Sequence, residues 1–224
     1  MDELRTNMSI IELDNRVLDG HTDKNNTSLP TSIIGLLFAT NNTAGTATEE
    51  GRTGATPTSA SESLVYFIKR HEGHAPTGYG FYDDPSGYCT VGYGHLVAKQ
   101  TCSSIDALPA GSRLKRDKDS LSWITSEADA DRQLRIDIQA AVDAVRRHVT
   151  VPLTQYQLDA LTDFVFNLGE GQFARSTLLR ELNARHYDRV PQELMRYRFS
   201  RDVELRGLVL RRTSEVAMWN YGIY

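Results

Sequence analysis

Three short segments carry the side chains whose types and spacing could do chemistry. They are His71-Glu72-Gly73, Tyr82-Asp83-Asp84 and Thr90-Val91-Gly92-Tyr93-Gly94-His95. A glutamate that closes a helix would face an aspartate on the following hairpin across a cleft, once the hairpin folds back. Cleavage of a glycosidic bond needs two such carboxyls, one protonated and the other ionised. The three segments together therefore predict a site that acts on a saccharide.

Each segment alone also has a more ordinary interpretation. A glutamate at a helix end is usually a solvated surface group, and Asp84-Pro85-Ser86-Gly87 is a common turn sequence. For His95 we expect a structural ion pair or hydrogen bond rather than a part in the chemistry. The chemical hypothesis thus depends on the three segments coming together.

Helical periodicity and turn residues predict the elements that would position these groups. Ser59-x-x-Glu62 is a capping-box pattern, and it opens a helix expected to end near Glu72-Gly73. Residues 81–97 are predicted as a small antiparallel hairpin. Further helices are predicted over 126–149, from Thr154 to Gly169, over 176–184 and 191–198, and around Leu208, Leu210, Val216 and Trp219. The expected fold is α+β, mostly helical, with a small β-hairpin subdomain beside the cleft.

Charge and composition divide the chain of 224 residues into two parts. The formal net charge is −4, and residues 1–60 hold eight acids and four bases, so residues 61–224 are neutral. Between Ala39 and Ser61 there is no aromatic residue and no Val, Leu, Ile or Met, a composition typical of a flexible linker. We therefore expect an N-terminal arm and linker over 1–60 and a catalytic domain over 61–224.

The same composition excludes several classes of protein. With 25 Lys and Arg against 29 Asp and Glu, the chain is not a basic nucleic-acid binder. The longest apolar run, residues 33–39, is far shorter than the ~20 residues of a membrane-spanning helix. The acidic start Met-Asp-Glu-Leu-Arg is unlike a signal peptide. The apolar patches at 8–18 and 28–39 are interpreted either as loose packing or as a docking or delivery segment.

In this order, the segments resemble the signature of phage-type lysozymes, the endolysin family of glycoside hydrolases. The resemblance continues in Ala160–Gly169 and in Ser176–Asn183. It ends with Gly207-Leu208-Val209 followed by Arg211, Arg212 and Glu215. It covers roughly residues 61–222, and four separated motifs in one order make it specific.

The resemblance implies a role for each matching residue. Glu72 would be the general acid at a β-1,4 bond between N-acetylmuramic acid and N-acetylglucosamine. Asp84 would stabilise positive charge on the sugar and orient water, and Thr90 would hold that water, so that the reaction inverts the anomeric centre. Leu96 and Phe166 would line the saccharide. The stretch after Glu72 is longer than in the family, and counting back from Thr90 selects Asp84 rather than Asp83 as the second carboxyl.

Cys89 and Cys102 flank the Gly-Tyr-Gly-His turn and are interpreted either as small core thiols or as a disulfide. An oxidising working compartment favours the disulfide. No spacing of Cys and His fits zinc, and no phosphate loop is present, so neither a metal nor a cofactor is expected.

Two alternative functions stay open at this stage. A lytic transglycosylase needs only the acid, and a non-catalytic wall-binding or tail protein would need only the scaffold. In each case peptidoglycan is the expected partner of a monomer made in the cytoplasm and acting in the periplasm or cell wall. A holin, a phage tail or a contractile secretion machine would deliver it, and a delivered toxin would have an immunity protein that plugs the cleft.

Overall fold

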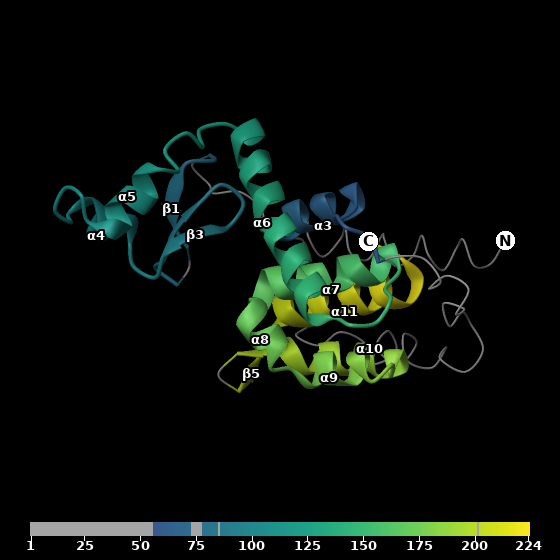
Figure 1. Ribbon diagram of the computed structural model, residues 1–224. Helices are drawn as coiled ribbons and strands as arrows, with labels where there is room; N and C mark the ends of the chain where they lie inside the picture. The colour runs from purple at the N-terminus through teal and green to yellow at the C-terminus, as the bar shows by residue number, and fades with distance from the viewer. Residues whose placement is uncertain (1–55, 73–77, 85, 201) are drawn as a thin grey trace, which may run out of the picture. The chain divides into compact units, whose positions relative to one another are not determined.

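A computed structural model describes residues 56–72, 78–84, 86–200 and 202–224 (Figure 1). Most of the predicted arm and linker therefore lies outside the described residues. The strands are β1 (Phe81–Asp83), β2 (Cys89–Val91), β3 (His95–Ala98), β4 (Phe199–Ser200) and β5 (Val203–Glu204). The α-helices are α3 (Glu62–Glu72), α4 (Cys102–Asp106), α5 (Arg113–Asp119), α6 (Glu127–His148), α7 (Gln155–Leu168), α8 (Glu170–Ala174), α9 (Thr177–Asn183), α10 (Val190–Leu194) and α11 (Arg206–Tyr221). The predicted α+β class with mostly helical structure is confirmed.

Helix α7 lies at the centre of the helical part, where α6 and α11 both pack against it (Figure 1). Its residues Leu158, Leu161 and Phe164 are fully buried. The helix begins as the sequence predicts, because the Thr154 hydroxyl accepts a hydrogen bond from the Gln157 amide and the Gln157 side-chain oxygen accepts one from the Thr154 amide. This helix therefore provides a fixed support for the elements around it. No helix among the described residues is long and apolar enough to cross a membrane.

Helix α3 begins two residues later than the predicted capping box. The Ser61 hydroxyl, rather than that of Ser59, accepts the hydrogen bond from a first-turn amide, that of Leu64, at 3.2 Å. Ser59 precedes the helix, and its carbonyl accepts from the Gln155 side chain at 3.1 Å. The predicted end of the helix at Glu72 is confirmed.

Strands β1, β2 and β3 form an antiparallel sheet in that order (Figure 1). Thr90 in β2 lies opposite Tyr82 in β1 and Leu96 in β3. The predicted hairpin therefore has a third strand, since the Gly92 and Gly94 backbones take positive φ angles of 61° and 78° in the tight turn before it. Helices α4 and α5 follow the sheet and were not predicted, because neither is long enough to show a clear apolar period.

The predicted single helix over 191–198 is wrong in its second half. Helix α10 ends at Leu194 and a 3-10 turn, η4 (Met195–Arg198), follows. Tyr197 leaves helical geometry there, with φ −95° and ψ 35°. The chain then forms the β4–β5 hairpin, which the sequence did not predict, before α11 begins.

The segment just before α3 is attached to the helical part. The Thr56 hydroxyl accepts from the Leu153 amide at 3.2 Å. The buried Asp159 carboxylate accepts from the Ser61 amide at 3.1 Å and from the Tyr224 hydroxyl. One side chain of α7 thus holds both the start of α3 and a residue that follows α11.

Candidate active site

Glu72 lies at the end of α3, where its carboxylate meets a buried arginine of α11. Oε1 of Glu72 accepts from Nη1 of Arg211 at 2.7 Å. The other face of Arg211 is held by Asp163 of α7, whose two oxygens accept from Nε at 2.9 Å and from Nη2 at 2.7 Å. The Glu72 side chain is 23% exposed, whereas those of Arg211 and Asp163 are 7% and 0% exposed. Glu72 is therefore fixed from inside the protein and still open to solvent.

Arg211 is charged despite its burial. Burial disfavours the charge, but the carboxylates of Asp163 and Glu72 more than compensate, and they raise the pKa of Arg211 above its usual range. A bidentate pair between guanidinium and carboxylate also fixes the orientation of both groups. The direction in which Glu72 points is thus set by α7 through Arg211.

The turn between β2 and β3 approaches the same carboxylate from the other side. A Cβ atom added at Gly94 would lie 3.0 Å from Oε2 of Glu72, closer than most real Cβ contacts. Gly94 also has φ +78°, a conformation that side chains disfavour. Glycine is therefore favoured at this position by the backbone, and any side chain there would also press on the Glu72 carboxylate.

Tyr82 connects Glu72 with Asp84. Burial raises the pKa of the Tyr82 phenol, and the negative charges of Glu72 and Asp84 raise it further. Both carboxylates therefore act on one side chain of β1, which brings the two predicted acids into one neighbourhood.

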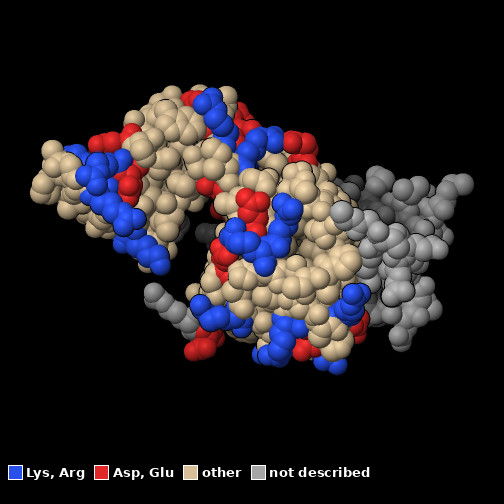
Figure 2. All heavy atoms as spheres, in the orientation of Figure 1, with Lys and Arg blue, Asp and Glu red and all other residues tan. Residues whose placement is uncertain are grey.

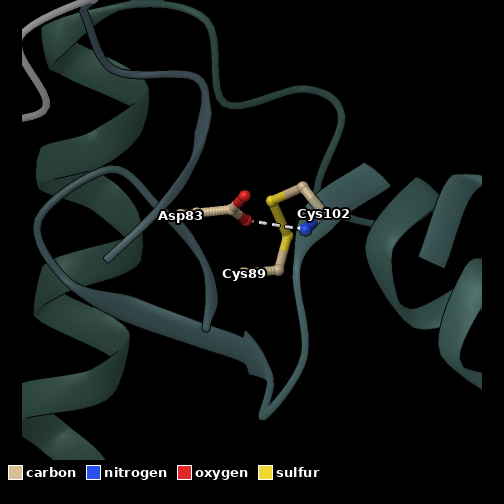
Figure 3. A group of neighbouring side chains, drawn as sticks. All are labelled: Asp83, Cys89 and Cys102. Carbon is tan, nitrogen blue, oxygen red and sulfur yellow. Dashed lines mark hydrogen bonds between the residues drawn. A yellow bond between two sulfur atoms is a disulfide. The ribbon is translucent and has the colours of Figure 1, made fainter. Parts of the chain in front are cut away.

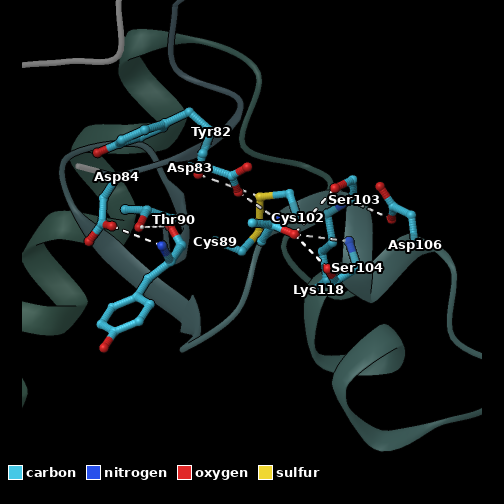
Figure 4. Close-up of a disulfide and its surroundings, with 12 residues drawn as sticks. Tyr82, Asp83, Asp84, Cys89, Thr90, Cys102, Ser103, Ser104, Asp106 and Lys118 are labelled. Atoms are coloured by element: carbon cyan, nitrogen blue, oxygen red, sulfur yellow. Dashed lines mark hydrogen bonds and ion pairs between the residues drawn. A yellow bond between two sulfur atoms is a disulfide. The ribbon is translucent and has the colours of Figure 1, made fainter. Parts of the chain in front are cut away.

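Asp84 is held by the turn that follows β1. Its Oδ1 accepts from the amides of Ser86 at 2.8 Å and Tyr88 at 2.9 Å. Both bonds use Oδ1, and none from the part of the chain that the structure describes uses Oδ2. Thr90 is buried in β2, and its hydroxyl donates to the Tyr88 carbonyl at 3.0 Å. Figure 4 shows Tyr82, Asp84 and Thr90 together on one side of the strand.

The two residues predicted to line the saccharide lie beside different parts of this group. Leu96 is 47% exposed and pairs across the strands with Thr90. The Phe166 ring centre lies 6.0 Å from the Arg211 guanidinium. Figure 2 shows a hollow on one face of the molecule, between the part with β1, β3, α4 and α5 and the helical part, with charges of both signs around it.

Asp83 points away from Asp84 and has a different partner. Its Oδ1 accepts from the Cys102 amide at 2.7 Å, at the first residue of α4 (Figure 3). Cys102 is joined to Cys89 by a disulfide between α4 and β2. The three side chains are close enough to suggest a metal site, but sulfurs joined to each other are not available as thiolate ligands. The group is better explained as a structural link.

His95 has the structural contact that the sequence analysis expected. Its Nδ1 lies 2.8 Å from Oδ2 of Asp137 on α6, and the same aspartate accepts from the Gln133 side chain at 2.9 Å. The contact joins β3 to α6 and so supports the turn that carries Gly94.

Sequence reasoning gave no role to Arg211 or Asp163, although both lay within motifs of the resemblance. A signal was present in α11, where Val209, Arg212, Val216 and Trp219 recur at helical spacing on one buried face. A charged residue in an apolar stripe indicates a buried ionic partner. For Arg212 that partner is Glu215 of the same helix, whereas Asp163, the partner of Arg211, lies on α7 and has no local signature.

A mostly helical domain with a small sheet, with a glutamate held by a buried arginine and an aspartate in the turn after the first strand, defines a lysozyme-like protein. The chain belongs to the phage lysozyme family, because the model of that family, described as Phage lysozyme, matches residues 69–215.

Individual relatives agree with this assignment. The chain is 40% identical over 95 residues to a SAR-endolysin of Escherichia phage Mu, a match that covers 42% of this chain and 56% of the relative. It is 34% identical over 127 residues to the endolysin of Salmonella phage P22, with 57% and 75% covered. The match to the endolysin of Bacillus phage B103 covers 72% of this chain and 54% of that relative, so the chain spans little more than half of two of these relatives.

Solved structures show the same fold. A P22 lysozyme mutant superposes with a TM-score of 0.53 at 28% identity, covering 72% of this chain and 97% of that one. The muramidase domain of SpmX from Asticaccaulis excentricus gives a TM-score of 0.53 at 30% identity, covering 71% and 95%. The lysozyme-like fold predicted from the motifs is confirmed.

Proposed function

We propose that this protein is a peptidoglycan muramidase that hydrolyses the β-1,4 bond between N-acetylmuramic acid and N-acetylglucosamine. The observation that carries the proposal is the position of Glu72, held by Arg211 at 2.7 Å and open to solvent on its other side. The muramidase named among the solved relatives supports the same activity. The proposed general acid is Glu72, and Asp84 and Thr90 are its proposed partners.

In the first part of the reaction, protonated Glu72 donates its proton to the glycosidic oxygen as the bond to the muramic acid carbon breaks. Positive charge develops on that sugar ring. The Asp84 carboxylate, with Oδ1 held by two backbone amides, keeps its negative charge in a fixed place and stabilises the ring.

In the second part, water attacks the same carbon from the opposite face. The Thr90 hydroxyl donates to the Tyr88 carbonyl, so its oxygen lone pairs can accept a hydrogen bond from that water. A new carbon–oxygen bond forms and Asp84 takes the proton that the water releases, while Glu72 is left ionised. Attack opposite to the leaving group inverts the anomeric centre.

Three aspartate and glutamate variants test the proposal on purified peptidoglycan. Glu72→Gln removes the proton donor, and Asp84→Asn removes the charge. We expect each to lose activity by about 10²–10⁴-fold, the usual contribution of such a group. Asp83→Asn is the matched control, since Asp83 bonds Cys102 instead, and it should retain hydrolysis. Full activity of Glu72→Gln would overturn the assignment.

The reaction products separate the alternatives. NMR early in the reaction shows which anomer of the new reducing end forms first. The inverted anomer supports the proposed hydrolysis. Anhydro-muramic ends would indicate a lytic transglycosylase. Binding to peptidoglycan without any bond cleavage would indicate a wall-binding protein on a lysozyme-like scaffold.

We also propose that residues 1–60 serve delivery to the cell wall rather than catalysis. The family match begins at residue 69, and the full formal charge of −4 lies in residues 1–60. Because Thr56 and Ser59 already contact the helical part, the truncation that tests the proposal should remove residues 1–55 only. It should hydrolyse purified peptidoglycan at the normal rate and fail to lyse intact cells that produce it. Loss of hydrolysis in vitro would contradict this role.

A delivered enzyme of this kind would also have an immunity protein that covers the proposed site. Affinity capture with the inactive Glu72→Gln protein, from cells that tolerate the wild type, tests for one. A captured protein that blocks hydrolysis by the wild-type enzyme supports the proposal.

A further inference from the structure

Helix α11 carries a second buried charge pair next to Asp163, the residue that holds the arginine partner of the proposed acid. Arg212 and Glu215 of α11 are fully buried, and Nη2 of Arg212 lies 2.6 Å from Oε1 of Glu215. The same Nη2 donates to the Asn167 side chain of α7 at 2.9 Å. Neither Arg212 nor Glu215 is used in the proposed reaction.

The cluster has one more carboxyl than it has guanidiniums. Three carboxyls, those of Glu72, Asp163 and Glu215, face two guanidiniums, those of Arg211 and Arg212. With all five groups ionised, the net charge is −1 in a region where Asp163 and Glu215 have no solvent exposure. An uncompensated charge in the interior is strongly unfavourable, so the cluster is neutral when it holds a single proton.

Glu215 is the carboxyl best placed to hold that proton. Both oxygens of Asp163 accept hydrogen bonds from Arg211, whereas neither oxygen of Glu215 accepts a correctly aligned one from the described part of the chain. Burial raises the pKa of Glu215 well above its usual range, and the neighbouring Asp163 carboxylate raises it further. Burial alone would raise the pKa of Asp163. The charge of Arg211, together with hydrogen bonds from Arg211 and Glu215, outweighs this effect and holds the pKa below its usual range.

We propose that Glu215 is a positioning residue for the general acid. The cluster holds one proton, which is on Glu215 when Glu72 is ionised and on Glu72 when Glu215 is ionised, so that the cluster is neutral in both states. With Glu72 ionised and Glu215 protonated, two carboxylates balance two guanidiniums. With Glu72 protonated and Glu215 ionised, Asp163 and Glu215 balance the same two guanidiniums, and Arg212 is already within 2.6 Å of Glu215. Without a titrating group at 215, protonation of Glu72 would leave a net charge of +1 in the interior. The inference rests on the proposed role of Glu72.

Two other titratable groups lie near Glu72 in the fold or in the sequence. Tyr82 of β1 stays neutral at the pH of the assay, because burial and nearby carboxylates raise the pKa of its phenol. His71 precedes Glu72 on α3, and its ring packs on Phe67 with 4.3 Å between the centres. A His71→Asn background therefore removes the imidazole from the titration without changing the carboxyl count.

The first test is the pH dependence of hydrolysis by full-length Glu215→Gln, which keeps the shape of the side chain and cannot ionise. On solubilised peptidoglycan, we expect the alkaline limb of its rate profile to move at least one pH unit lower, which is about a tenfold lower rate on that limb. The acidic limb and KM should stay as in the wild type. Glu170→Gln, the same change at a partly exposed glutamate of α8, is the matched control. Superimposable profiles, or a uniform loss at every pH, would overturn the proposal.

The second test measures the titration of Glu215 without any substrate. A carboxyl with a raised pKa in the folded protein contributes stability that is complete below its ordinary pKa, and this stability is lost as the pH rises through the folded pKa. The urea midpoint of the wild type should therefore fall between pH 6 and pH 9 by more than that of Glu215→Gln. Parallel falls would show that Glu215 does not titrate and would overturn the inference. An active Glu72→Gln would instead overturn the proposed acid, and the two failures are distinguishable.

Discussion

Replacing Cys89 and Cys102 together by alanine should lower the free energy of unfolding by about 3 kcal/mol. The bridged residues are 13 positions apart. In the chain-entropy relation, closing a loop of this length removes about 10 cal/mol/K from the unfolded ensemble, which is about 3 kcal/mol at 25 °C. Total stabilities of about 5–15 kcal/mol leave the variant folded at that temperature. For a domain of this size the melting temperature should fall by about 6–12 °C.

Urea unfolding at 25 °C, with and without a thiol reductant, is the assay. The reduced wild type keeps both sulfur atoms, so its loss of stability isolates the cross-link from the packing of Cys89, which is fully buried. Reductant should leave the double variant unchanged, since the chain has two cysteines. A variant within 1 kcal/mol of the oxidised wild type, or one that reductant weakens equally, would refute the loop-closure reasoning.

Two further changes test the supports of α7. Thr154→Ala removes the capping hydroxyl and should cost about 1 kcal/mol in urea unfolding, and a serine in its place should restore the loss. Asp163→Asn removes a carboxylate that balances the charge of the buried Arg211, and it should lower the free energy of unfolding by about 3–5 kcal/mol. Combining it with Arg211→Met should cost less than the sum of the two single changes in a double-mutant cycle, and strict additivity would contradict the buried pair.

Local interactions explain which elements the sequence could predict. The cap formed by Thr154 and Gln157 uses residues three positions apart, so the pattern and the structure agree. At α3 the same pattern predicted Ser59 as the cap. The Ser59 carbonyl instead accepts a hydrogen bond from Gln155, which is 96 positions further along the chain, and the residue stays outside the helix. Helices α4 and α5, and the β4–β5 hairpin, are too short for a periodic signal.

In the candidate site, too, the local motifs could be predicted from the sequence and the long-range contacts could not. Glu72, Asp84 and Thr90 occur in compact motifs and could be named from the sequence. What holds Glu72 could not, because Arg211 is 139 positions further along the chain. Its second partner, Asp163, is 48 positions away on another helix. Such contacts depend on how α3, α7 and α11 pack, and no short pattern encodes that packing.

The distance in sequence between Glu72 and Arg211 also bears on when the proposed site is assembled. A ribosome reads α3 early, and α11 follows only after every other described helix has been made. A nascent chain therefore carries Glu72 for most of its synthesis with nothing to orient the carboxylate. A chain that stops before residue 211 would contain all three residues proposed for hydrolysis and still lack the assembled site. The order of the elements along the messenger thus delays assembly of the proposed site until translation of the domain is nearly finished.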